Sequence, residues 1–220
     1  MGRNAAFFVV AVCMSGPGGL GTAEAFTGRQ AGHLLFEASL GGALGAGEDS
    51  SDSGEAEGTA GYSVGLLGGI GGKLKGFPPR FFLVGGIESA SWGALSSDSF
   101  GEGRVDRQAT MVTGGLRMLF PLWSRRLRLV TEARSGVAMV DSEGGRPGLP
   151  GATTADTYGV MLLGAGLQAR LNDRLSAGFR LDRTWGLDTG ADIAAAAAGL
   201  GRDGSGRGRL ALGLTFTLHL

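Results

Sequence analysis

Hydrophobic and polar residues alternate strictly along the end of the chain. One set of alternate positions holds Leu210, Leu212, Leu214, Phe216, Leu218 and Leu220, and the other holds Ala211, Gly213, Thr215, Thr217 and His219. Successive side chains of a β-strand point to opposite sides of the sheet. This segment is therefore predicted to be a strand with one apolar face and one small or polar face.

Seven earlier segments repeat this alternation, so eight strands are predicted in all. The clearer apolar faces are Leu34, Phe36, Ala38 and Leu40; Val112, Leu116, Met118 and Phe120; Leu127, Leu129, Val137 and Met139; Met161, Leu163, Ala165, Leu167 and Leu171; and Leu175, Ala177, Phe179, Leu181 and Trp185. In the second and third segments, Leu66 and Leu67 are adjacent, as are Phe81 and Phe82, so one residue of each pair must face the other way. We assign Leu83 and Ile87 to the apolar face, because this places Glu88 on the opposite one.

Connections between the segments alternate in length. The long connections, rich in Gly, Ser and Asp, are predicted at Gly45–Thr59, Gly93–Gln108, Asp141–Asp156 and Gly186–Gly208, and the short ones at Lys75–Pro79, Pro121–Arg125 and Asn172–Asp173. Transmembrane barrels have short turns at the periplasmic side and long loops outside. Four long and three short links are what eight strands of such a barrel require. Trp92, Trp123, Trp185, Tyr62 and Tyr158 lie near predicted segment ends, where an aromatic girdle would place them.

The composition narrows the choice of fold and partners. Glycine occurs 44 times with only 6 prolines and no Gly-X-Y period, which disfavours helices and collagen. The formal net charge is zero, so nothing favours a nucleic-acid partner. The single cysteine, Cys13, allows neither a disulfide nor a cysteine-based zinc site in a mature protein without the leader. No metal or other cofactor is predicted.

The first residues have the pattern of a cleaved signal peptide. A positively charged start at Met1–Asn4 precedes an apolar run, Ala5–Met14, and Ala23-Glu24-Ala25 offers the small residues of a cleavage site. The apolar run is about half the roughly 20 residues that a membrane-spanning helix needs. Residues 1–25 are therefore predicted to be a signal peptide and residues 26–220 a single exported domain.

Alternation alone does not say which face is inside, because a soluble barrel would bury the apolar face. Strands of about ten residues, at roughly 3.3 Å each and tilted, span about 25 Å of hydrocarbon. The small side chains of the polar face also suit a narrow lumen, so we expect the apolar face to meet lipid. The charged residues then predicted to point into the lumen are Glu37, Glu88, Arg117, Arg128, Glu132, Arg134, Arg170, Arg180 and Asp182. Buried charges persist when paired, which predicts a salt-bridge plug; an ion-selective pore is the alternative.

The segments together resemble the eight-stranded outer-membrane barrels, the group that contains the OmpA transmembrane domain and OmpX. The resemblance covers about residues 31–220 and implies an all-β, closed, eight-stranded antiparallel up-and-down transmembrane barrel in the bacterial outer membrane. It also implies that Leu214, Phe216, Leu218 and Leu220 form the strand recognised by the barrel assembly machinery. Such strands usually end on an aromatic residue, and Leu220 departs from that pattern.

The sequence offers little catalytic chemistry. His33 and His219 are the only histidines, and both are predicted on the inward face at the periplasmic end. Two ligands without nearby carboxylates make a poor metal site. We therefore expect a monomeric, non-enzymatic protein that contacts outer-membrane lipid and lipopolysaccharide and acts structurally or in surface interactions through four long loops. A narrow channel for ions or small solutes and a soluble periplasmic ligand-binding barrel are the alternatives.

Overall fold

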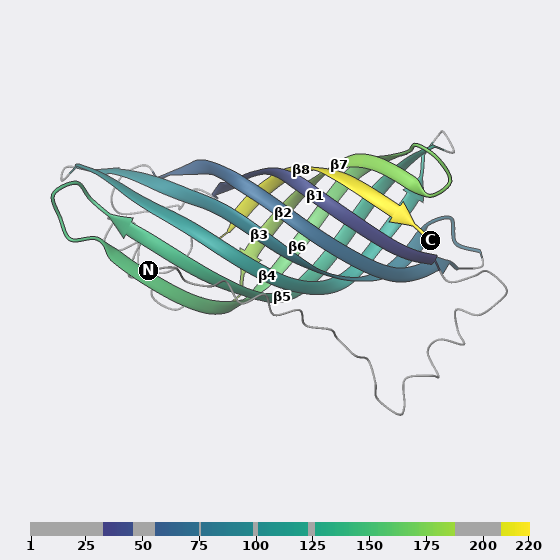
Figure 1. Ribbon diagram of the computed structural model, residues 1–220, viewed down its shortest axis with the longest axis horizontal. Coiled ribbons are helices and arrows are strands. Elements are labelled where there is room, and N and C mark those ends of the chain that lie inside the picture. The colour runs from purple at the N-terminus through teal and green to yellow at the C-terminus, as the bar shows by residue number, and fades with distance from the viewer. Residues whose placement is uncertain (1–32, 46–55, 75, 99–100, 123–125, 188–207) are drawn as a thin grey trace, which may run out of the picture.

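The computed structural model describes residues 33–45, 56–74, 76–98, 101–122, 126–187 and 208–220, so the predicted signal peptide lies outside the described residues. The described chain forms eight strands: β1 (His33–Gly45), β2 (Ala56–Lys73), β3 (Arg80–Asp98), β4 (Gly101–Pro121), β5 (Leu127–Gly145), β6 (Ala152–Arg170), β7 (Leu175–Gly186) and β8 (Arg209–His219). Each strand pairs antiparallel with the next along the chain (Figure 1). The part of the chain that the structure describes contains no helix long and apolar enough to cross a membrane.

The sheet closes on itself between its first and last strands. β1 pairs with β8 from Leu35 opposite His219 to Gly45 opposite Arg209. The two backbones pass so close that a Cβ on Gly41 would lie 2.2 Å from the carbonyl oxygen of Leu212. The predicted fold class, a closed eight-stranded antiparallel up-and-down barrel, is confirmed.

Three short connections lie at one end of the barrel, which we call the turn end. Their described residues are 74, 76–79, 122, 126 and 171–174, and β1 begins and β8 finishes at the same end. All three fall where short links were predicted. At the opposite end, which we call the far end, β1, β3, β5 and β7 finish and β2, β4, β6 and β8 begin.

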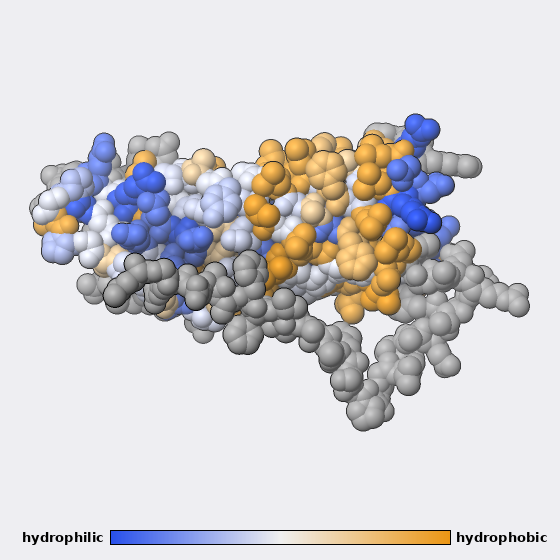
Figure 2. All heavy atoms as spheres, viewed as in Figure 1, coloured by the Kyte–Doolittle hydropathy of each residue, from blue (hydrophilic) through white to orange (hydrophobic). Residues whose placement is uncertain are grey.

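Next to the turn end, the faces follow the sequence prediction. The apolar side chains of alternate positions point outward, and the adjacent pairs divide as they must: Leu66 is 61% exposed, while Leu67 is buried. Leu83 and Ile87 are exposed and Glu88 is buried, so the assignment of the third strand is confirmed. Figure 2 shows these apolar side chains gathered over the half of the barrel nearest the turn end. We call this surface the apolar belt; its members include Leu34, Phe36, Leu40, Leu66, Ile70, Leu83, Leu116, Leu163, Phe179, Leu181, Leu212, Leu214, Phe216 and Leu218.

Toward the far end the polarity of the two faces is reversed. Arg104 and Asp106 are exposed on β4, while Val105 between them is fully buried. On β5, Asp141 and Glu143 point outward. The exterior of this half is therefore mostly polar, as on the outside of a water-soluble barrel and as the pale and blue surface in Figure 2 indicates. Its interior holds apolar side chains together with the buried Arg107 and Arg209.

Two of the four predicted long loops are wrong. β3 and β4 pair up to Asp98 opposite Gly101, so most of Gly93–Gln108 is strand. β5 and β6 pair up to Gly144 opposite Ala152, which reduces the predicted Asp141–Asp156 loop to a short link. The chain alternates through both stretches with its faces reversed, and backbone pairing satisfies groups that a loop would leave to water. The first and fourth long links contain residues 46–55 and 188–207, which lie outside the described residues.

The five strands from β2 to β6 are much longer than the other three. They contain 18 to 21 residues each, whereas β1, β7 and β8 contain 11 to 13. The far-end parts of β3, β4, β5 and β6 continue beyond the apolar belt and form a polar wall (Figure 2). We define the polar wall as residues 93–98 and 101–108 together with 141–145 and 152–157.

Two apolar layers fill the lumen above and below its middle. Leu35, Leu67, Phe82, Val84, Leu119 and Val130 form the layer near the turn end. The far-end layer consists of Ala43, Ala90, Trp92, Ala109, Met111, Ala138, Val140, Tyr158, Val160 and Ala211. Trp92 and Tyr158 are thus buried inside the barrel, so their assignment to an outer aromatic girdle is wrong; they point inward because the faces reverse there.

Candidate functional site

A cluster of ion pairs lies across the middle of the lumen, which we call the lumen network. Its side chains come from β1, β4, β5 and β7, each at an inward-pointing alternate position. Glu37, Glu132 and Asp182 face Arg117, Arg134 and Arg180, and all six side chains are 7% exposed or less. Three carboxylates opposite three guanidinium groups leave the network without net formal charge.

Arg117 joins two carboxylates from opposite sides of the lumen. Its Nη1 and Nη2 donate to the two carboxylate oxygens of Glu37 at 2.7 and 2.8 Å, a bidentate pair. Its Nε and Nη2 donate to Oε2 of Glu132 at 2.8 and 2.6 Å. Such planar, charge-assisted pairs are among the strongest hydrogen bonds in proteins.

Arg180 extends the network to β7. Its Nη1 donates to Oε1 of Glu37 at 2.7 Å, and its Nε donates to Oδ2 of Asp182 at 2.7 Å. Arg134 Nη2 lies 2.9 Å from Oε1 of Glu132, an ion pair whose angles fall short of a hydrogen bond. These charges fit because β6 has a glycine beside them: a Cβ on Gly164 would lie 2.3 Å from Oδ1 of Asp182.

Neutral side chains bound to this network were not found from the sequence. Thr217 donates to Oε2 of Glu37 at 2.8 Å and accepts from Gln168 at 2.6 Å. Arg134 Nη1 donates to Thr113 Oγ1 at 2.9 Å. Alternation places all three on the inward face, so their parity was a signal, but no sequence pattern indicated their partners.

Glu88, which was predicted to belong with the other lumen charges, forms a separate pair nearer the far end. Its partner is Arg209, a fully buried residue that also lies over the ring of Trp92 at 5.8 Å. Arg209 was missed because it adjoins the predicted fourth loop, although its position continues the inward set of Ala211 and Gly213. Arg107, also fully buried, was missed because it fell inside a predicted loop.

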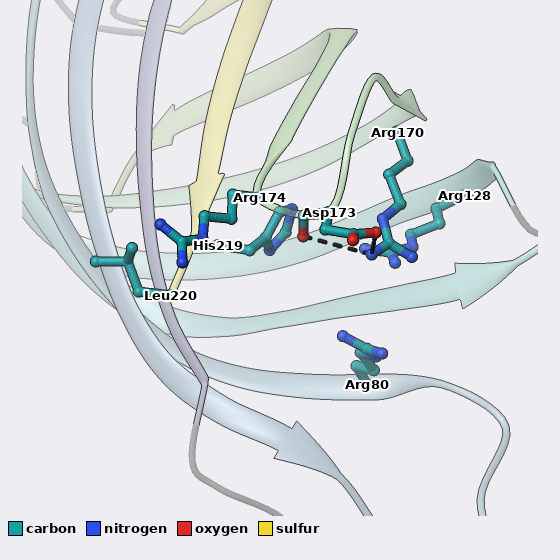
Figure 3. A pocket seen from close by; sticks show the side chains of 7 residues that line it. All are labelled: Arg80, Arg128, Arg170, Asp173, Arg174, His219 and Leu220. Carbon is teal, nitrogen blue, oxygen red and sulfur yellow. Dashed lines mark hydrogen bonds and ion pairs between the residues drawn. The ribbon is translucent and has the colours of Figure 1, made fainter.

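Arg128 and Arg170 are not part of the lumen network. They lie at the turn end, where they line a cavity of about 560 Å³ with Arg80, Asp173, Arg174, His219 and Leu220 (Figure 3). Arg170 donates from Nη2 to Oδ1 of Asp173 at 2.7 Å. The sequence thus predicted that these two arginines point inward, but it did not predict that they lie at the mouth of the barrel.

The predicted histidine site is only partly described. His219 lies at the turn end, with Nε2 3.2 Å from Oγ of Ser176; the side chain of His33 lies outside the described residues. Ser176 is fully buried, and Asp173, which lines the same cavity as His219, is paired with Arg170. The described residues hold no group of three or more metal-ligating side chains.

The four residues predicted as an assembly signal share the outer face of β8. Leu214, Phe216, Leu218 and Leu220 are between 39% and 60% exposed. Their recognition by an assembly machinery stays a prediction.

A closed eight-stranded ring, an apolar belt around the outside and ionised side chains across the inside together define the fold of an eight-stranded outer-membrane β-barrel. The chain is similar to a solved structure of this fold, neisserial surface protein A (NspA): the TM-score is 0.51 at 10% sequence identity, covering 84% of this chain and 96% of that one. Two weaker likenesses were found. Ail of Yersinia pestis, solved in complex with the heparin analogue sucrose octasulfate, gives a TM-score of 0.46 at 10% sequence identity, covering 86% of this chain and 99% of that one. The N-terminal β-barrel domain of Pseudomonas aeruginosa OprF gives a TM-score of 0.37 at 15% identity, covering 85% of this chain and 97% of that one. No protein-family model and no curated protein sequence matches the chain.

Proposed function

We propose that this protein resides in the bacterial outer membrane as a monomeric barrel with a closed lumen, and that it acts structurally or in surface interactions through its polar wall. The observation that carries the proposal is the pairing of an apolar belt outside with the lumen network inside. Lipid solvates the belt, and the network replaces water in the lumen. The proposal includes export by the predicted signal peptide, insertion by the assembly machinery and no enzymatic activity.

The reversal of polarity supports this placement. A strand inside a membrane needs an apolar outer face, whereas a strand in water needs a polar one. Along the same strands, the apolar belt meets the first requirement near the turn end and the polar wall meets the second near the far end. With short turns on the periplasmic side, the wall projects from the cell, where lipopolysaccharide or an external partner would contact it.

The filled lumen favours a plug over the alternative of a channel. Eight strands enclose only enough space for side chains. Here the lumen network lies between two buried apolar layers, and Arg117 at the centre is fully buried. An ion entering from either end would have to displace packed apolar groups before it reached the charges.

Conductance measurement tests this proposal. The folded protein, incorporated into planar lipid bilayers, should produce no discrete conductance steps. A mock preparation, purified in the same way from cells that lack the protein, serves as the control for contaminating detergent and porins. Reproducible steps from the folded protein alone would contradict the plug and favour the narrow channel.

A further inference from the structure

The mouth of the lumen at the turn end is a cationic vestibule. Its walls are Arg80 of β3, Arg128 of β5, Arg170 of β6, Asp173 and Arg174 of the β6–β7 turn, and His219 and Leu220 (Figure 3). These side chains surround a cavity of about 560 Å³. The vestibule ends inward at the buried layer that contains Leu35, Phe82 and Val130.

The charges of the vestibule are not balanced by the chain itself. Arg80 and Arg170 both lie close enough to Arg128 to repel it. Asp173, whose side chain is 97% exposed, pairs with Arg170. Neither Arg80 nor Arg128 forms an ion pair with a carboxylate among the described residues.

The arginines of the vestibule differ from those of the lumen network in how they are paired. In the network each guanidinium group meets a carboxylate of the chain. At the mouth, three half-buried guanidinium groups converge on one space with a single side-chain carboxylate at its rim. Converging like charges favour a bound anion, and arginine forks match the oxygens of phosphate in a bidentate manner.

We propose that this vestibule binds a phosphate group, held by Arg80, Arg128 and Arg170. Two sources supply this chemistry at the periplasmic surface: the headgroup of an anionic phospholipid and a soluble phosphate. Because the apolar layer closes the inner end, the vestibule retains the group rather than passing it on. The periplasmic sources of the ligand and its retention rest on the proposed function, whereas phosphate binding by the three arginines can be measured independently of it.

Isothermal titration calorimetry of the folded protein in nonionic detergent tests the site. One arm titrates inorganic phosphate, and the other titrates dihexanoyl phosphatidylglycerol below its micellar concentration. The test variant combines Arg80→Gln with Arg128→Gln. If this double variant does not fold, the single variant Arg128→Gln replaces it. The matched control is Arg126→Gln, because Arg126 is an exposed arginine at the same end that does not line the cavity.

Saturable binding is expected in at least one arm, weakened about tenfold or more by the double variant and unchanged in Arg126→Gln. Binding of phosphate in the first arm identifies a soluble ligand, and binding only in the second identifies a lipid headgroup. Absence of saturable binding in both arms would overturn the proposal. So would an equal loss in Arg126→Gln, since that outcome means general attraction to a positive surface.

Discussion

Replacing Arg117 with methionine should lower the free energy of unfolding by about 3–5 kcal/mol, because it leaves buried carboxylates without their main counter-charge. Glu37 loses a bidentate partner and Glu132 loses the donor of two of its hydrogen bonds. The measurement is urea unfolding of the barrel in phospholipid vesicles, followed by the heat-modifiable gel mobility of folded barrels.

Two further variants separate charge from packing. Arg104→Met breaks an exposed pair with Asp106 and should leave the unfolding midpoint unchanged. Adding Glu37→Gln to Arg117→Met removes one of the stranded charges and should restore part of the lost stability. If Arg117→Met unfolds at the same urea concentration as Arg104→Met, the lumen network does not stabilise the barrel.

An arginine in the apolar belt should also destabilise the inserted protein strongly. Leu214 is 60% exposed, and its neighbours in register are Leu40 and Phe179, which are exposed as well. Leu214→Arg should cost about 2–4 kcal/mol in a bilayer, the range for arginine at the midplane of a transmembrane barrel. The same unfolding assay in vesicles provides the measurement.

The control for this variant is Thr153→Arg, an exposed position on the polar wall opposite Glu143. It adds the same side chain to a surface that we expect to lie in water, so its unfolding should match that of the unchanged protein. Equal stability of the two variants would mean that Leu214 does not face lipid.

The sequence predicted the strands because a period of two is a local property. In β8 every second side chain from Leu210 to Leu220 faces outward, as alternation alone requires. For the adjacent pair Leu66 and Leu67, alternation required that one of the two turn inward, but it did not say which. Closure followed from the need of a membrane sheet to pair every backbone group.

The errors arose where the polarity of the outer surface changes. At Arg104, Val105 and Asp106 the alternation continues, but the polar residues point outward. A glycine-rich stretch with outward polar residues looks like a loop when the outer face is assumed to be apolar along the whole strand. The same assumption assigned Trp92 to an external girdle, although it lies inside against Arg209.

The pairings within the lumen could not be predicted from the sequence at all. Glu37 and Arg180 are 143 residues apart and meet only because the barrel closes with a particular register. Alternation correctly sent both side chains inward. It carried no information on their height along the barrel, which is why Glu88, Arg128 and Arg170 were grouped with charges they do not touch.

The central claim is that the apolar belt faces lipid while the polar wall faces water. Fluorescence quenching measures this directly, with a bimane label on single cysteines introduced at Leu181 or Leu214 of the belt and at Thr153 or Ala155 of the wall. In vesicles, brominated lipid should quench the belt labels, and a water-soluble quencher should quench the wall labels. Belt labels that the aqueous quencher reaches as readily as wall labels, with no effect of brominated lipid, would contradict the claim and favour a soluble barrel.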